Sequence, residues 1–188
     1  MSKIDNNPLL KGASGMLGET MVFRTVRGQL QMANRPKRRT NISEKQAAVQ
    51  TKFQEAAQYA TQQLSQEASS ALYEAGITSK KHSAYLVAVS DYLNAPKVHF
   101  IEAIGYRGNV GDTITVKATD DFMVTGLKIV IKGSDGAILE EGEAEPDLEK
   151  INLWTYKTTV ANPSVPGTSI KATAFDRPGN STSLEKVV

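Results

Sequence analysis

The stretch Ile114-Thr-Val-Lys-Ala-Thr119 decides the fold, because apolar and polar residues alternate along it as they do in a half-buried β-strand. The same alternation returns at Leu127-Lys-Ile-Val-Ile131 and at Ile170-Lys-Ala-Thr-Ala174. Turn-forming residues such as Ser134-Asp135-Gly136 separate the runs. The pattern predicts seven strands, at residues 98–104, 113–119, 126–132, 137–143, 151–160, 168–175 and 181–187.

Seven short strands at this spacing predict an immunoglobulin-like or fibronectin-III-like β-sandwich over residues 96–188. Trp154 is the single tryptophan of the chain and lies two residues before Tyr156 in one of these runs. We expect both aromatic side chains to lie between the two sheets and to supply bulky core.

Residues 42–95 carry helical patterns instead. Ser43 and Gln46 form a capping box, which predicts that a helix begins there. The apolar residues that follow recur on one helical face; they are Val49, Phe53, Ala56, Ala60 and Leu64. A second helix is predicted over 66–75, ended by Gly76, and a third over 80–93, capped by Ser79. Three helices this short bury little alone, so we expect them to dock on the sandwich, on the N-terminal segment or on another copy.

The first 41 residues show no sustained helical period and contain glycine at positions 12, 15 and 18. The runs 19–26 and 29–33 flank Arg27-Gly28, which predicts a β-hairpin within an extended basic arm. The expected fold class is therefore α+β, with an arm at 1–41, a helical segment at 42–95 and a sandwich at 96–188.

Composition excludes several classes of site. The chain has no cysteine, which rules out a disulfide framework, a thiolate zinc site and a cysteine nucleophile. It has no run of 18 apolar residues and no apolar export signal at its start, so we expect a protein made in the cytoplasm with no membrane contact. Phosphate-binding glycine motifs and a nucleophile elbow are absent. The sequence therefore predicts neither an enzyme nor a cofactor.

Charge is unevenly distributed along the chain. Residues 1–95 carry 12 Lys+Arg against 7 Asp+Glu, whereas residues 96–188 carry 10 against 13. A basic cluster consists of Arg35, Lys37, Arg38 and Arg39. It has three interpretations: a weak, non-specific nucleic-acid contact, an assembly contact to the acidic stretch 140–149 of a neighbouring subunit, or a solvated linker.

Three carboxylates, Asp120, Asp121 and Asp176, are expected at one end of the sandwich. They could hold Ca²⁺ together with Asn180. The preferred interpretation is that Asp120 and Asp176 accept hydrogen bonds from turn amides, as aspartates at strand ends commonly do. The two histidines, His82 and His99, have no histidine or cysteine at ligand spacing, so no metal site is predicted through them.

The runs at 114–121, 127–131 and 154–156, together with Ile170-Lys-Ala-Thr-Ala-Phe-Asp-Arg-Pro-Gly-Asn180, resemble bacterial immunoglobulin-like domains over about half of the chain. The front half, with Val22-Phe-Arg-Thr-Val-Arg-Gly28 and Asn34-Arg-Pro36, resembles uncharacterised small proteins of bacteria and their tailed phages. Together these resemblances imply a non-catalytic structural protein of a phage-like particle, such as a capsid decoration, collar, tail or fibre component. Its partners would be copies of itself and other particle proteins, with Val49 and Phe53 as contact residues. The alternatives are a nucleic-acid-associated protein and a carbohydrate-binding surface module.

Overall fold

The structure is a computed structural model that describes residues 2–3, 12–26, 28–36 and 42–188. The chain divides into two compact units, residues 1–46 and residues 47–188. The second unit contains both the helical segment and the β-rich half, so the helices dock within the chain.

The first unit is built around a four-stranded antiparallel sheet with the strand order β1-β4-β3-β2. Its strands are β1 (Ser2–Lys3), β2 (Gly15–Leu17), β3 (Met21–Val26) and β4 (Gln29–Asn34). The predicted hairpin is confirmed, since β3 and β4 pair with Val26 opposite Gln29. Gly28 in the turn has φ +75°, a left-handed conformation that favours glycine.

The helical segment holds three helices: α1 (Glu44–Leu64), α2 (Glu67–Ala75) and α3 (Ala84–Leu93). The capping box at the start of α1 is confirmed: the Gln46 amide donates to Ser43 Oγ and the Ser43 amide donates to Gln46 Oε1. The helices pack on one another through a small core made of Ala56, Ala60, Tyr73, Val87, Ala88 and Val89. Within the described residues, no helix is long and apolar enough to cross a membrane.

The start predicted for the third helix is wrong. Its N-cap is Ser83, whose side chain accepts a hydrogen bond from the Leu86 amide, and not Ser79. The residues before it form a turn in which the amide of Thr78 donates to the carbonyl of Lys81. That turn directs the Lys81 side chain toward the sandwich, and the helix begins only after it.

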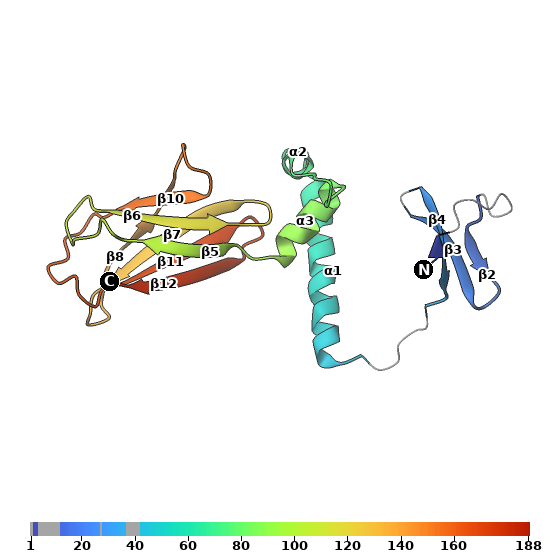
Figure 1. Cartoon of the computed structure of the whole chain (residues 1–188), viewed down its shortest axis with the longest axis horizontal. Coiled ribbons are helices and arrows are strands. Elements are labelled where there is room, and N and C mark those ends of the chain that lie inside the picture. The colour runs from blue at the N-terminus through green and yellow to red at the C-terminus, as the bar shows by residue number, and fades with distance from the viewer. Residues whose placement is uncertain (1, 4–11, 27, 37–41) are drawn as a thin grey trace. The chain divides into compact units, whose positions relative to one another are not determined.

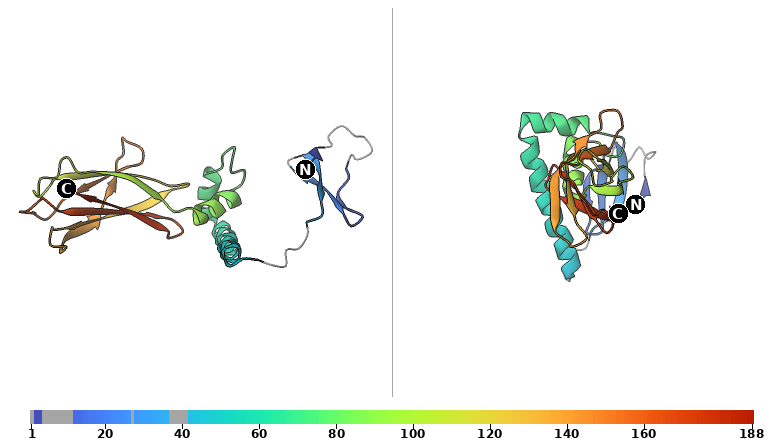
Figure 2. Two further views of the ribbon diagram at one scale, coloured as in Figure 1. Left: turned by 60° about the horizontal axis from the view of Figure 1, so that its bottom comes forward. Right: turned by 90° about the vertical axis from the view of Figure 1, so that its left-hand side faces the viewer.

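The β-rich half forms two four-stranded antiparallel sheets, with the orders β5-β6-β10-β9 and β12-β11-β7-β8. The strands are β5 (Lys97–Glu102), β6 (Thr113–Thr119), β7 (Val124–Lys132), β8 (Ile138–Glu143), β9 (Glu145–Pro146), β10 (Leu153–Lys157), β11 (Ser169–Asp176) and β12 (Ser181–Val187). Each predicted run corresponds to one strand, and the short β9 is an addition. Figures 1 and 2 show the helices at one end of this half and the C-terminus at the other.

One hydrophobic core joins the two sheets, as in a β-sandwich. The inward positions predicted from the alternation are buried, including Ile114, Ile129 and Ala172. Trp154 is 8% exposed and Tyr156 is buried, so both lie in this core as predicted. At the far end, the amide of Val188 donates to the carbonyl of Thr168 over 2.9 Å, which holds the last residue against the sandwich.

Candidate functional site

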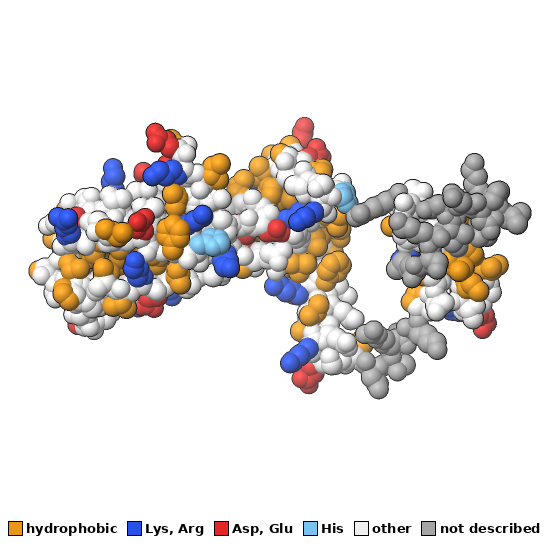
Figure 3. Space-filling model, in the orientation of Figure 1, with side chains coloured by type: hydrophobic (Ala, Val, Ile, Leu, Met, Phe, Trp, Pro, Cys, Tyr) orange, Lys and Arg blue, Asp and Glu red, His pale blue; other side chains and the backbone are white. Residues whose placement is uncertain are grey.

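The exposed part of α1 is the first candidate surface. The apolar stripe predicted on this helix splits into two parts: Ala56 and Ala60 are buried under α2 and α3, while Val49 is 69% and Phe53 53% exposed. The cause is length, because α1 has 21 residues and its two partners have only 9 and 10. The N-terminal turns of α1 therefore extend beyond the helices that cover the rest of it, as Figure 1 shows, and hydrophobic side chains are visible along α1 in Figure 3.

The basic cluster is only partly described. The Arg35 side chain is exposed, and the Arg35 amide donates to the carbonyl of Thr20 over 2.7 Å. Lys37, Arg38 and Arg39 lie outside the described residues. The choice among the three interpretations of this cluster stays a prediction.

Two of the three candidate calcium ligands hold turns together. Asp120 Oδ2 accepts hydrogen bonds from the amides of Phe122 and Met123, each over 2.9 Å. Asp176 Oδ1 accepts from the amides of Gly179 and Asn180 over 2.9 and 2.6 Å. These are the turn contacts that the preferred interpretation expects. Among the described residues, no group of three His, Cys, Asp or Glu side chains is placed to hold a metal ion.

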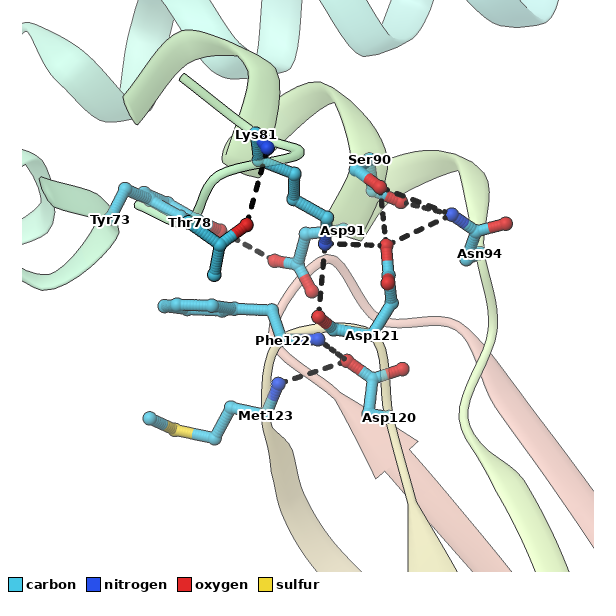
Figure 4. A network of polar contacts seen from close by, with 10 residues as sticks. All are labelled: Tyr73, Thr78, Lys81, Ser90, Asp91, Asn94, Asp120, Asp121, Phe122 and Met123. Atoms are coloured by element: carbon cyan, nitrogen blue, oxygen red, sulfur yellow. Dashed lines mark hydrogen bonds and ion pairs between the residues drawn. The ribbon is translucent and has the colours of Figure 1, made fainter. Parts of the chain in front are cut away.

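Asp121 instead joins the sandwich to the helical segment (Figure 4). Its Oδ2 atom lies 2.7 Å from Lys81 Nζ and also accepts hydrogen bonds from Ser90 Oγ and from Asn94 Nδ2. Burial acts to raise the pKa of Asp121, but the hydrogen bonds from Lys81 and Ser90 outweigh it and hold the pKa below its ordinary value. The carboxylate is therefore kept ionised by its partners across the junction.

Phe122 is the apolar anchor of the same junction. Its ring extends from the turn after β6 and stacks on Tyr73 of α2, with ring centroids 4.7 Å apart. Gly76, which ends α2 as predicted, makes room for this ring: a Cβ atom at position 76 would lie 2.7 Å from Phe122 Cε2. Since Gly76 has φ −84°, the glycine serves this close approach and not a left-handed cap.

Two polar side chains near the β11–β12 turn complete the junction. Arg177 donates from Nη2 to Ser69 Oγ over 2.6 Å and to Gln63 Oε1 over 3.3 Å, and its guanidinium lies 5.5 Å from the centroid of the Tyr73 ring. Asn180 donates from Nδ2 to the carbonyl of Tyr92 over 3.2 Å. The sandwich therefore contacts all three helices.

Asp91 lies at the centre of this junction and was not among the residues singled out from the sequence. It is 0% exposed, and Tyr73 donates its hydroxyl proton to Asp91 Oδ2 over 2.7 Å (Figure 4). Tyr73 in turn lies 2.8 Å, hydroxyl to hydroxyl, from Tyr59 of α1. The available sequence signal is a lone carboxylate within the mostly apolar run 84–93.

A cavity of about 240 Å³ lies beside the junction at the same end of the sandwich. Its apolar walls come from Phe122, Met123 and Trp154, and its polar walls from Asp120 and Asn152. Asn152 is the one non-glycine residue with positive φ in the described part of the chain. With Trp154 only 8% exposed, the cavity does not present an open aromatic platform.

The two histidines lie apart from these features. His82 is exposed in the turn before α3, and His99 on β5 lies 2.6 Å from Thr119 Oγ1 through its Nε2 atom. No family model, no curated protein and no solved structure matches the chain.

Proposed function

We propose that this chain is a non-catalytic structural protein of a phage-like particle, in which it contacts copies of itself and other particle proteins. The observation that carries the proposal is the stripe left exposed on α1, Val49 and Phe53. A helix that continues its apolar face beyond its own partners offers that face to a neighbouring chain. The resemblance of the two halves to bacterial immunoglobulin-like domains and to small phage-associated proteins supplies the setting.

The order of the strands supports an immunoglobulin-like or fibronectin-III-like fold for the sandwich. When β5, β6, β7 and β8 are lettered A, B, C and C′, and β9 to β12 are lettered D to G, the two sheets are ABED and C′CFG. Immunoglobulin-like sandwiches use this arrangement. The chain departs from antibody domains in having no cysteine pair and in carrying its tryptophan on β10, the E position.

The occupant that we propose for the α1 stripe is the same stripe of a second copy. Packed about a two-fold axis, each stripe would bury the exposed parts of one valine and one phenylalanine. The exposed parts of these two side chains amount to about 200 Å² of apolar area per chain, and at about 25 cal/mol per Å² their burial favours association by roughly 5 kcal/mol per chain before the entropy cost of association. Symmetric repetition of this contact across a particle would multiply its effect.

The test is the oligomeric state of the purified chain, measured by light scattering and native mass spectrometry from about 1 to 100 µM, a range that covers typical specific affinities. The double variant Val49→Ala, Phe53→Ala should weaken association by at least tenfold while preserving α1, since alanine favours helix. The matched control is Ile104→Ala, because Ile104 is an equally apolar, exposed residue on the sandwich. A stable monomer at 100 µM would refute the self-association.

The nucleic-acid alternative has its own measurement. Titration with duplex DNA should give binding no tighter than about 10⁻⁴ to 10⁻⁶ M at physiological salt, the non-specific range. Sequence-selective binding below 1 µM that is lost when Arg35, Lys37, Arg38 and Arg39 are all changed to alanine would replace the structural proposal. The carbohydrate alternative would need an exposed aromatic side chain to contact a sugar, and Trp154 does not serve because it is buried in the sandwich core.

A further inference from the structure

Two carboxylate oxygens are buried without a partner at the junction between the helices and the sandwich. They are Asp91 Oδ1 on α3 and Asp120 Oδ1 in the turn after β6, and the described part of the chain holds no other buried side-chain polar atom of this kind. Asp91 is the more deeply buried, at 0% exposure. An ionised carboxylate in such a place keeps part of the cost of its desolvation uncompensated, because one of its oxygens receives no hydrogen bond.

The charges that face Asp91 add to this cost. Asp120 from the β6–β7 turn and Asp176 from the end of β11 both raise its pKa through their negative charge, while Lys81 from the turn before α3 lowers it. Lys81 is mainly engaged by Asp121, at 2.7 Å. Among the described residues, the Tyr73 hydroxyl on α2 is the one hydrogen-bond donor to the Asp91 carboxylate. Tyr73 in turn contacts the Tyr59 hydroxyl of α1 and the Arg177 guanidinium.

Burial is the largest cause of the shift, and together with the two carboxylates it raises the pKa of Asp91 to about 6. The ordinary value for aspartate is near 3.9. Between these two values the folded chain holds a proton on Asp91 that the unfolded chain has released. A proton on Oδ1 would cancel the repulsion by Asp120 and Asp176 and would leave the hydrogen bond from Tyr73 to Oδ2 in place.

We propose that Asp91 is a proton-binding switch of the junction: taking up a proton on Oδ1 tightens the docking of the three helices on the sandwich, and losing that proton loosens it. The geometry that carries this proposal is a buried, half-satisfied carboxylate placed where the helices meet two further carboxylates of the sandwich. The proposal is independent of the α1 stripe and of any assembly function, because its contacts lie within one chain.

The direction of the pH dependence follows from linkage. Because the pKa of Asp91 is higher in the folded chain, the stability that its proton contributes is fully present below about pH 4. It is lost as the pH rises through about 6 and is absent above that. For one proton the folding equilibrium constant falls by up to tenfold per pH unit, and therefore by about a hundredfold between pH 4 and pH 6.

The test combines urea unfolding of the full chain between pH 4.5 and 8 with carboxyl-carbon NMR of Asp91. Wild type should lose stability as the pH rises, with an Asp91 midpoint near 6. Asp91→Asn, which mimics the protonated form, should be the more stable protein at pH 7.5 and should remove most of the slope. Asp135→Asn is the control for the substitution itself, because Asp135 caps a turn amide after β7, outside the junction.

Substitutions at three residues near Asp91 should shift its titration midpoint in directions that a purely structural role for Asp91 would not produce. Asp120→Asn should lower the Asp91 midpoint, because it removes a repelling charge while its amide oxygen still caps the turn. Tyr73→Phe and Lys81→Met should each raise the midpoint, because Tyr73 and Lys81 both favour the ionised carboxylate. Hydrogen exchange of the α3 amides, corrected for intrinsic rates, should slow below pH 6 in wild type and stay constant in Asp91→Asn. An Asp91 midpoint at or below 4, or equal pH slopes for wild type and Asp91→Asn, would overturn the proposal.

Discussion

Gly76→Ala should destabilise the protein, although the backbone conformation at this position alone would predict a gain in stability. Position 76 has φ −84°, which alanine adopts freely, so the substitution should gain about 0.4–1 kcal/mol by restricting the unfolded chain. The added Cβ, however, would lie 2.7 Å from Phe122 Cε2 and 3.0 Å from Val87 Cγ1. Overpacking of this kind costs about 1–3 kcal/mol, because the stacked ring of Phe122 must move.

We therefore expect a net loss of about 1–2 kcal/mol in the free energy of unfolding, measured by urea denaturation. Gly126→Ala is the matched control, since a Cβ there meets nothing within 4 Å, and it should be neutral or slightly stabilising. Combining Gly76→Ala with Phe122→Ala should remove the clash, so the double variant should be less destabilised than the sum of the two single variants. A Gly76→Ala protein at least as stable as wild type would refute the view that Phe122 sets the identity of residue 76.

Two further predictions concern the sandwich. Trp154→Ala should cost about 3–5 kcal/mol of stability in a circular-dichroism melt, as large aromatic truncations in packed cores do, and native Trp154 emission should be blue-shifted; an exposed emission maximum would contradict its burial. Glu140→Ala should lower the free energy of unfolding by about 2–4 kcal/mol, measured by urea denaturation. Glu140 Oε2 accepts hydrogen bonds from the Thr159 amide at 2.7 Å and from Tyr156 Oη at 3.2 Å, and the variant leaves both donors without this partner. The exposed Glu143→Ala should stay within about 0.5 kcal/mol of wild type, and equal losses for the two glutamates would argue against the buried contacts.

The strands were predictable because one face of each is buried in the shared core. Where alternation is clear, as in β6 and β11, the predicted runs differ from the observed strands by no more than one residue at either end. The pairing of these strands follows from contacts between distant segments, such as Ile170 opposite Ile131, which no local pattern encodes. No local pattern predicted that β1 and β2 would pair with the strands of the predicted hairpin either.

The helices were predictable in number and less so in their bounds. Ser43 and Gln46 mark the start of α1 because a capping box is a local interaction. Serine is a good N-cap at either position, so residue type does not distinguish Ser79 from Ser83; in the structure the N-cap is Ser83, and Lys81 in the turn before it reaches across to Asp121. The local sequence does not encode a tertiary contact of this kind, and tertiary context routinely outweighs local preference.

The junction was the least predictable part of the molecule. Phe122 follows a strand end and has no periodic partner in the sequence, yet it packs among the helices. Asp91 stands in an apolar helical run, where the usual expectation for a carboxylate is solvent exposure, yet it is fully buried at the junction of the helices and the sandwich. Phe122 stacks on Tyr73, and Asp91 accepts a hydrogen bond from the same Tyr73 while it faces Asp120 and Asp176 of the sandwich, so segments far apart in the sequence set both environments.

The arrangement of the chain ends has a mechanical consequence. The polypeptide enters the sandwich at Lys97, beside the helices, and reaches Val188 at the opposite end, with Lys186 Nζ donating to the carbonyl of Ile101 where β12 and β5 run alongside one another (Figure 1). Tension applied between the helices and Val188 would run along the strands, loading the hydrogen bonds between β11 and β12 in shear and all together instead of one after another. The sandwich is therefore built to transmit a pulling force along its long axis without opening from one edge.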